Sequence, residues 1–155
     1  MSRSEVTAFV ALGANLGDAA QALRDALANL AEVPGIRLVR ASSVYRTAPV
    51  ESSGPDYLNA VAEVSTTLTA PDLLNALQSI EQQAGRERPY RNAPRTLDLD
   101  LLMYGASRID SSRLTVPHPR MGQRAFVLVP LAEIAPSLVS AAQLAAVAGQ
   151  TIEKI

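Results

Sequence analysis

The order of the elements that the sequence predicts indicates an α+β fold. We expect a ferredoxin-like core (β-α-β-β-α-β) with a mainly antiparallel sheet and appended elements, arranged as an α/β sandwich. Two patterns support this: apolar residues alternate with period two in strand-like segments, and they recur at helical spacing in two segments between them. A length of 155 residues suits one domain, so we expect residues 1–155 to form a single unit.

The first strand and helix are the clearest elements. Residues 6–12 are apolar on both faces, which is typical of a strand in the middle of a sheet. Asp18 is a suitable N-cap for an amphipathic helix over residues 19–31, which a proline-glycine pair ends. The glycines between strand and helix fit neither a dinucleotide fingerprint nor a P-loop, so we expect a plain connecting turn.

The second half of the core follows the same logic. Residues 36–45 and 57–67 are the second and third strands, which we expect to pair in a hairpin-like return. The proline- and glycine-containing loop at 47–56 is long enough to be functional. The second helix starts at a capping-box-like Thr69 and ends at Gly85.

The last core strand follows a strongly basic loop over residues 86–94 and ends at a tyrosine-glycine pair. Beyond it we expect a short strand at 114–116, a helix over 124–134 that restarts at Pro130, and a terminal helix at 141–147.

Composition narrows the function classes. The net charge is −1, and no apolar run approaches the roughly 18 residues that cross a bilayer, so we expect neither a nucleic-acid nor a membrane partner. The chain has no cysteine, which excludes disulfides and thiolate metal sites and fits a reducing cytoplasm. The N-terminus lacks a signal-peptide layout, and we expect a cytoplasmic location.

Two acidic residues are the strongest chemical signal. Leu97, Leu99 and Leu101 alternate with polar residues, so Asp98 and Asp100 should project side by side from the opposite face of a strand. Such a pair can bind one divalent ion or bridge two, and magnesium suits it because it completes its shell with water and substrate phosphates. The alternative is a surface strand that points two charges at water.

Arginines gather around this strand, although the chain as a whole is slightly acidic. Eight lie in one span: Arg86, Arg88, Arg91, Arg95, Arg108, Arg113, Arg120 and Arg124. Carboxylates with arginines are the equipment of phosphoryl transfer, since arginine forks take up phosphate charge. Nucleases and polymerases also use carboxylate pairs, so a metal-dependent phosphodiesterase remains open. A nucleic-acid-binding module without catalysis is a further alternative, against which the acidic pair and the few aromatic residues count.

Four other residues have two interpretations each. His118, the only histidine, is either a structural hydrogen-bonding residue or a phosphate contact. Asn59 could bind the edge of a heterocycle on which Tyr57 or Phe126 stacks. From the residues alone, cross-strand packing and a satisfied polar contact are favoured for these three.

Seven blocks in matching order resemble the 6-hydroxymethyl-7,8-dihydropterin pyrophosphokinases (2-amino-4-hydroxy-6-hydroxymethyldihydropteridine diphosphokinases) of folate biosynthesis. The blocks are residues 12–17 (LGANLG), 43–49 (SVYRTAP), 56–60 (DYLNA), 80–88 (IEQQAGRER), 94–100 (PRTLDLD), 116–121 (VPHPRM) and 130–136 (PLAEIAP). Ala14 and Ala48 depart from the usual serine and proline, and Tyr90 and Asn92 lie where some members carry a covering tryptophan.

The resemblance implies transfer of pyrophosphate from ATP to the pterin hydroxymethyl oxygen, with release of AMP. It also implies a monomer in which the loops 47–56 and 86–94 close over the reactants. It implies that Asp98 and Asp100 bind two Mg²⁺ ions, and that Arg86 and Arg95 are catalytic with them. The implied ATP-binding residues are Gln78, Glu81, Arg86, Arg88, Arg95, Leu101, Arg113, Thr115, His118 and Arg124. The implied pterin-binding residues are Thr47, Pro49, Val50, Tyr57, Asn59 and Phe126.

Overall fold

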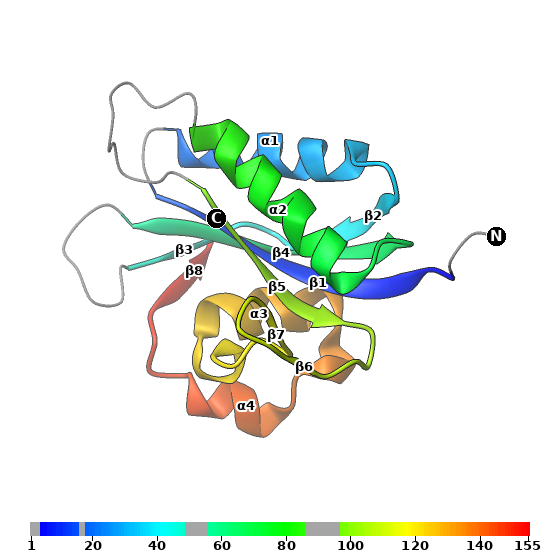
Figure 1. Ribbon diagram of the computed structural model, residues 1–155. Helices are drawn as coiled ribbons and strands as arrows, with labels where there is room; N and C mark the ends of the chain where they lie inside the picture. Colours follow the sequence, from blue (N-terminus) through cyan, green and yellow to red (C-terminus); the bar gives the residue numbers. More distant parts are fainter. Residues whose placement is uncertain (1–3, 16–17, 49–55, 86–96) are drawn as a thin grey trace.

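The computed structural model describes residues 4–15, 18–48, 56–85 and 97–155 (Figure 1). Its elements, in chain order, are β1 (Val6–Ala14), α1 (Ala19–Glu32), β2 (Ile36–Ala41), β3 (Tyr45–Thr47), β4 (Tyr57–Thr66), α2 (Ala70–Gly85), β5 (Asp98–Tyr104), β6 (Ile109–Asp110), β7 (Thr115–Val116), α3 (Ala125–Ile134), α4 (Ala141–Ala146) and β8 (Ile152–Lys154). Short 3-10 turns at Met121–Gln123 and Pro136–Leu138 flank α3. The predicted core order is confirmed, with the second predicted strand divided into β2 and β3.

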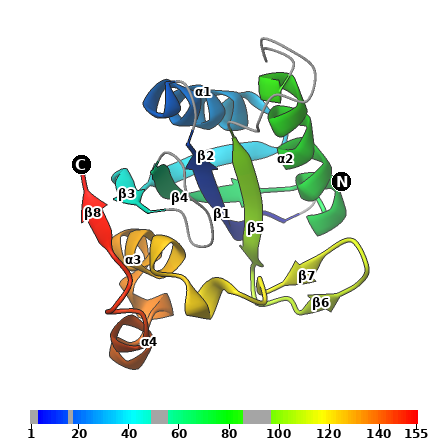
Figure 2. The same cartoon turned by 90° about the vertical axis from the view of Figure 1, so that its left-hand side faces the viewer.

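A six-stranded sheet forms the middle layer, in the order β5-β1-β4-β3-β8, with β2 also paired to β4. All of these pairs are antiparallel. Because β4 lies between β1 and the β2–β3 segment, the core has the interleaved strand order of a ferredoxin-like fold. The two views show α1 and α2 on one face of the sheet and α3 with α4 on the other (Figures 1 and 2). The predicted α+β sandwich is therefore correct.

The α1–α2 layer encloses the larger core. Leu23 and Leu30 of α1 and Leu73 and Leu77 of α2 are fully buried against alternate residues of the sheet. The carboxylate of Asp18 accepts a hydrogen bond from the Gln21 amide at 3.0 Å, which confirms the predicted N-cap. Burial of each leucine contributes about 1.5–3 kcal/mol, so this layer fixes the sheet that carries the site.

The second core lies between the opposite face of the sheet and α3. Val127, Leu128 and Leu131 pack there with Phe9 and Val61. The prediction that this helix restarts at its proline is wrong, because α3 is continuous through Pro130. In so short a helix, the proline removes one backbone hydrogen bond, and the buried apolar surface around it keeps the helix intact.

Both faces of β5 are covered after the acidic pair, because Leu101 faces the α1–α2 core and Leu102 faces the core under α3. The register of β5 against β1 shifts between Phe9 and Val10, which leaves Leu102 as the extra residue of a bulge. Met103 consequently packs on the α3 side as well, and Tyr104 returns to the α1–α2 core.

The C-terminal tail closes the far edge of the sheet. β8 pairs with β3, and the Ile155 amide donates to the Val44 carbonyl at 3.0 Å. Figure 2 shows β8 at the side of the sheet opposite β5. Neither β8 nor β6 was predicted, since each spans only two or three residues.

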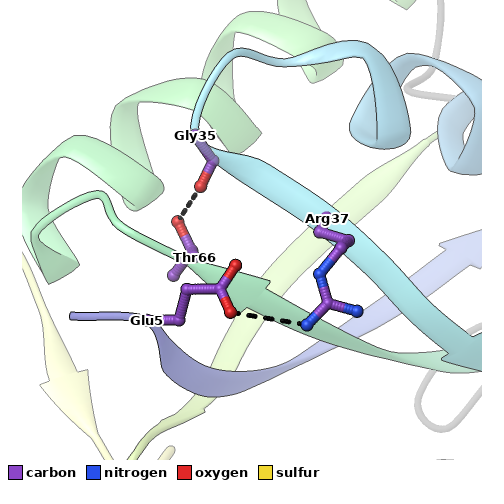
Figure 3. Close-up of polar contacts among 4 residues, drawn as sticks. All are labelled: Glu5, Gly35, Arg37 and Thr66. Atoms are coloured by element: carbon purple, nitrogen blue, oxygen red, sulfur yellow. Dashed lines mark hydrogen bonds and ion pairs between the residues drawn. The ribbon is translucent and has the colours of Figure 1, made fainter. Parts of the chain in front are cut away.

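The turn that leads from α1 into β2 is fixed by polar contacts (Figure 3). Gly35 has φ of +90°, a conformation that favours glycine, and its carbonyl accepts a hydrogen bond from the Thr66 hydroxyl at 2.7 Å. Arg37 and Glu5 form an ion pair at 3.5 Å, but both side chains are more than half exposed. The hydrogen bond to Gly35 thus defines the turn more than the ion pair does. Among the described residues, no helix is long and apolar enough to cross a membrane.

Candidate active site

The two acidic residues lie as predicted on one face of β5. Leu97, Leu99 and Leu101 are buried beneath α2, whereas Asp98 is half-buried and Asp100 is exposed on the face that carries α3. Two residues along a strand span about 6.6–6.8 Å, so the two carboxylates can converge on ligands between them.

A glutamate on α2 fastens the peptide between these aspartates. Glu81 accepts a hydrogen bond from the Leu99 amide at 2.7 Å, on the edge of β5 that does not pair with β1. A carboxylate acceptor makes such a bond stronger than one to a neutral group. Glu81, which the resemblance assigns to nucleotide binding, therefore also holds the strand that carries Asp98 and Asp100.

One row of paired residues crosses the sheet from this pair to the predicted pterin pocket. Gly13 of β1 pairs with Asp98 of β5 on one side and with Asn59 of β4 on the other. A Cβ atom on Gly13 would lie 3.1 Å from the Asn59 side-chain oxygen, so the glycine lets that amide lie across β1. At the usual strand spacing, the Asn59 and Asp98 backbones are about 9–10 Å apart.

Asn59 is buried and held in one orientation. Its Nδ2 donates to the Thr47 hydroxyl at 2.7 Å, and both side chains are less than 10% exposed. Thr47 pairs with Tyr57 across β3 and β4, so these three residues of the predicted pterin set are neighbours. The satisfied polar contact expected for Asn59 is present, and its side-chain oxygen remains directed over Gly13.

A depression of about 270 Å³ lies beside Asp100, lined by Leu101, Thr115, His118 and Arg113 among others. One Arg113 nitrogen donates to Asn75 at 2.7 Å and approaches Gln78 at 3.5 Å, which ties the β6–β7 hairpin to α2. The structure thus brings together five residues of the predicted nucleotide set, which are Gln78, Leu101, Arg113, Thr115 and His118. Asn75 was not predicted, although it precedes Gln78 by three residues and so shares its helix face.

The environment of His118 favours its neutral form. Burial lowers the pKa of His118, and the charges of Arg124 and Arg120 lower it further, against an opposing effect of Asp100. Its Nδ1 accepts a hydrogen bond from the Arg120 amide at 3.2 Å. The proton of the neutral ring therefore belongs on Nε2, which makes that atom a hydrogen-bond donor.

Arg124 and Phe126 join the two halves of the predicted site. The Arg124 guanidinium lies 5.3 Å from the centroid of the Phe126 ring, a cation–π contact. The resemblance assigns Arg124 to ATP and Phe126 to the pterin. The two residues flank the first residue of α3, so the N-terminus of this helix sets both positions.

Some of the predicted site residues lie outside the described part of the chain. These are Pro49 and Val50 in one loop, and Arg86, Arg88 and Arg95 in the other. The predicted roles of the loops 47–56 and 86–94 stay predictions for the same reason.

The predicted metal ligands are the two carboxylates of β5, Asp98 and Asp100. In the part of the chain that the structure describes, no group of three or more His, Cys, Asp or Glu side chains could hold a metal ion. Asp98 and Asp100 are two carboxylates on one face, which matches the habit of magnesium of taking one or two carboxylates and completing its shell with water and phosphate oxygens.

The sequence matches the family model of 7,8-dihydro-6-hydroxymethylpterin-pyrophosphokinase (HPPK) over residues 9–136. The chain belongs to the HPPK family. This span runs from within β1 past the end of α3 and contains every predicted site residue.

Relatives at high identity carry the same description. A 2-amino-4-hydroxy-6-hydroxymethyldihydropteridine pyrophosphokinase of Synechocystis is 48% identical over 132 residues, which are 85% of this chain and 68% of that protein. One of Haemophilus influenzae is 46% identical over 135 residues, 86% of this chain and 84% of the relative.

A solved structure that contains an HPPK domain has a similar fold. A crystal structure of an HPPK-DHPS in complex with substrates superposes with a TM-score of 0.71 at 14% sequence identity, covering 94% of this chain. The matched part is 43% of that longer chain. At this identity the likeness supports the HPPK fold, and residue roles rest on the site itself.

Proposed function

We propose that this HPPK-family chain transfers pyrophosphate from ATP to the hydroxymethyl oxygen of 6-hydroxymethyl-7,8-dihydropterin and releases AMP, as a step of folate biosynthesis. One observation carries the proposal: the row Asn59–Gly13–Asp98 puts an amide side chain and a carboxylate on one face of the sheet, two strands apart. Membership of the HPPK family, whose relatives bear this activity in their names, agrees with it.

On the pterin side, Thr47 uses one Nδ2 proton of Asn59, which leaves the other N–H and the side-chain oxygen for the edge of the heterocycle. Tyr57 and Phe126 are suited to contact the face of the ring. Pro49 and Val50 would complete the pocket. A fixed amide donor-acceptor pair distinguishes a pterin from an apolar ring, because an unmatched buried polar group is costly.

On the nucleotide side, Asp98 and Asp100 would hold two Mg²⁺ ions through their carboxylate oxygens. Bound magnesium neutralises phosphate charge and aligns the reacting oxygens. Glu81 keeps the two aspartates in register through the Leu99 amide. The neutral His118 donates from Nε2 to an oxygen of the nucleotide, and Gln78, Leu101, Arg113, Thr115 and Arg124 would line its site.

The reaction is an in-line displacement at the β-phosphorus of ATP. The pterin hydroxyl oxygen forms a bond to that phosphorus, the bond from the β-phosphorus to the α–β bridging oxygen breaks, and the hydroxyl proton is released. Arg86 and Arg95 would stabilise the charge that develops on the bridging and leaving oxygens, with Arg88 binding the nucleotide. Positioning and electrostatics suffice, since phosphoryl transfer needs little covalent help from the protein.

The test is AMP formation from ATP with and without the pterin, in magnesium and after chelation by EDTA. We expect AMP only when pterin and magnesium are both present. AMP without pterin would instead support the phosphodiesterase, and pterin-dependent AMP that persists in EDTA would contradict the magnesium assignment. We also propose a monomeric cytoplasmic enzyme, which sedimentation at micromolar concentration and cell fractionation can test.

A further inference from the structure

Gln150, in the tail between α4 and β8, contacts the N-terminus of α3. Its Oε1 accepts a hydrogen bond from the Ala125 amide at 2.9 Å, and its Nε2 donates to the Gln123 carbonyl at 2.8 Å. The N-cap residue itself, Arg124, makes no side-chain capping bond. Gln150 therefore supplies from 25 residues away the cap that helices usually obtain locally.

The bridged peptides enclose one residue of the proposed site and directly precede another. Gln123 and Ala125 lie on either side of Arg124, and Phe126 comes next. Because Gln150 holds the peptides on both sides of Arg124, it fixes the backbone direction of this residue. The fixed backbone favours the 5.3 Å contact between the Arg124 guanidinium and the Phe126 ring.

The tail is anchored well enough to act as a rigid support. Val147 is 4% exposed and packs in the core beneath α3, and the Gln150 amide donates to the Val147 carbonyl at 3.0 Å. Two residues after Gln150, β8 begins and pairs with β3. Gln150 is thus held between a buried side chain and a strand of the main sheet.

We infer that Gln150 is a positioning residue that caps α3 and thereby orients Arg124 toward the nucleotide and Phe126 toward the pterin. The inference rests on the proposed function, because the assignment of these two residues to the substrates does. Gln150 lies beyond residues 9–136, so the family match does not include this role. The tail beyond that match is in this view part of the active-site framework.

The experiment compares Gln150→Ala and Gln150→Glu with a matched control, Gln143→Ala. Gln143 is also a glutamine of the tail with a capping role, but its capping bonds are made with Ser140 at the start of α4 rather than with α3. Steady-state kinetics for both substrates are measured well below the melting temperature, with calorimetric binding of a non-hydrolysable ATP analogue in magnesium and hydrogen exchange of the Ala125 amide.

We expect Gln150→Ala to raise the KM for both substrates and the Kd of the ATP analogue about fivefold to tenfold, as the loss of about one or two hydrogen bonds implies. Exchange of the Ala125 amide should become faster. Gln150→Glu keeps the acceptor for that amide and should restore its slow exchange. The control should match the wild-type protein in KM and Kd even where its stability falls.

Two results would overturn the inference. The first is that Gln150→Ala binds both substrates as the control does, whatever the exchange rate of Ala125. The second is that Gln150→Ala and the control Gln143→Ala weaken binding equally, which would indicate a general loss of order in the tail. An inactive wild-type protein would refute the proposed function instead, and the Kd of the ATP analogue with the exchange of Ala125 would still decide the role of Gln150.

Discussion

Removal of one hydroxyl group tests the contact that joins β3 to α3. Tyr45 is 7% exposed, and its hydroxyl donates to Glu133 at 2.6 Å. Glu133 also accepts from the amide and hydroxyl of Ser43, at 2.9 Å and 3.0 Å. The change Tyr45→Phe therefore removes one charge-assisted bond without leaving the carboxylate unsatisfied.

The expected loss in the free energy of unfolding follows from that environment. A hydrogen bond to a charged group contributes about 1.5–3 kcal/mol, and the remaining bonds to Glu133 favour the lower half of this range. For a chain of this size, 1 kcal/mol shifts the melting temperature by roughly 2–4 °C, so we expect a decrease of about 3–9 °C at pH 7.

The loss of stability at alkaline pH gives a second, independent value for the contribution of the Tyr45 hydroxyl. Burial, the hydrogen bond to Glu133 and its negative charge raise the pKa of Tyr45 from 10.0 to about 12. A raised folded pKa means that the contribution is complete below pH 10 and is lost as the pH rises toward 12. The loss is about 2–3 kcal/mol at 1.36 kcal/mol per pKa unit. Tyr45→Phe should lack this loss, so wild type and variant should converge in stability above pH 11.

Urea unfolding followed by circular dichroism at pH 7 and pH 11.5 measures both quantities. A double-mutant cycle with Glu133→Gln isolates the pair from its surroundings. The reasoning is refuted if Tyr45→Phe stays within about 0.5 kcal/mol of wild type at pH 7 while its alkaline loss is unchanged. The acid limb supplies a check on the partner: burial alone would raise the pKa of Glu133, but hydrogen bonds from Tyr45 and Ser43 lower it overall, so its contribution should be lost as the pH falls below 4.5.

Three further outcomes are expected. Asp98→Ala or Asp100→Ala should abolish AMP formation with the circular dichroism spectrum unchanged, and full activity in either variant would remove the metal assignment. Thr47→Val leaves a buried Asn59 N–H without its acceptor and should lower the free energy of unfolding in urea by about 1–3 kcal/mol. The same change should raise the KM for the pterin more than the KM for ATP. An equal rise in both KM values would contradict the place of Thr47 on the pterin side. Because the folded pKa of His118 is lowered, the unfolded chain takes up its proton first, and stability should fall as the pH drops below 6.5; His118→Asn should flatten that limb in unfolding measured from pH 7.5 to pH 5.

Patterns that depend on one element were readable from the sequence. The alternation in β5 predicts buried leucines beneath an exposed acidic pair, and Asp18 predicts the start of α1, because both rules involve only neighbours in the chain. The division of the second predicted strand depends instead on its contact with β4, where the Val61 amide donates to the Ser42 hydroxyl at 2.9 Å directly after the end of β2. No periodicity in a single segment reveals such a contact.

Contacts between distant segments were not readable. The bond from Gln150 to Ala125, the place of Asn75 beside Arg113, and the role of Gly13 under Asn59 all depend on the packing of separate elements. The two-residue strand β6 carries too little alternation to be distinguished from a turn. The roles of Arg86, Arg88 and Arg95 came from the resemblance and stay predictions.

The row through Gly13 fixes the distance between the residue that we propose for pterin binding and one that we propose for metal binding. The separation of Asn59 from Asp98 is two interstrand steps, whose length is set by main-chain geometry and is nearly the same in any protein. Side-chain substitutions can change the affinity that we propose for either substrate, but they leave this backbone distance intact. A one-residue slip of β4 or β5 against β1 would turn every side chain of the slipped strand to the wrong face. The buried layers on both sides of the sheet therefore stabilise the register that sets this distance. The proposed distance between the pterin and the metal ions therefore depends on the main chain of three strands and not on the side chains that would bind either substrate.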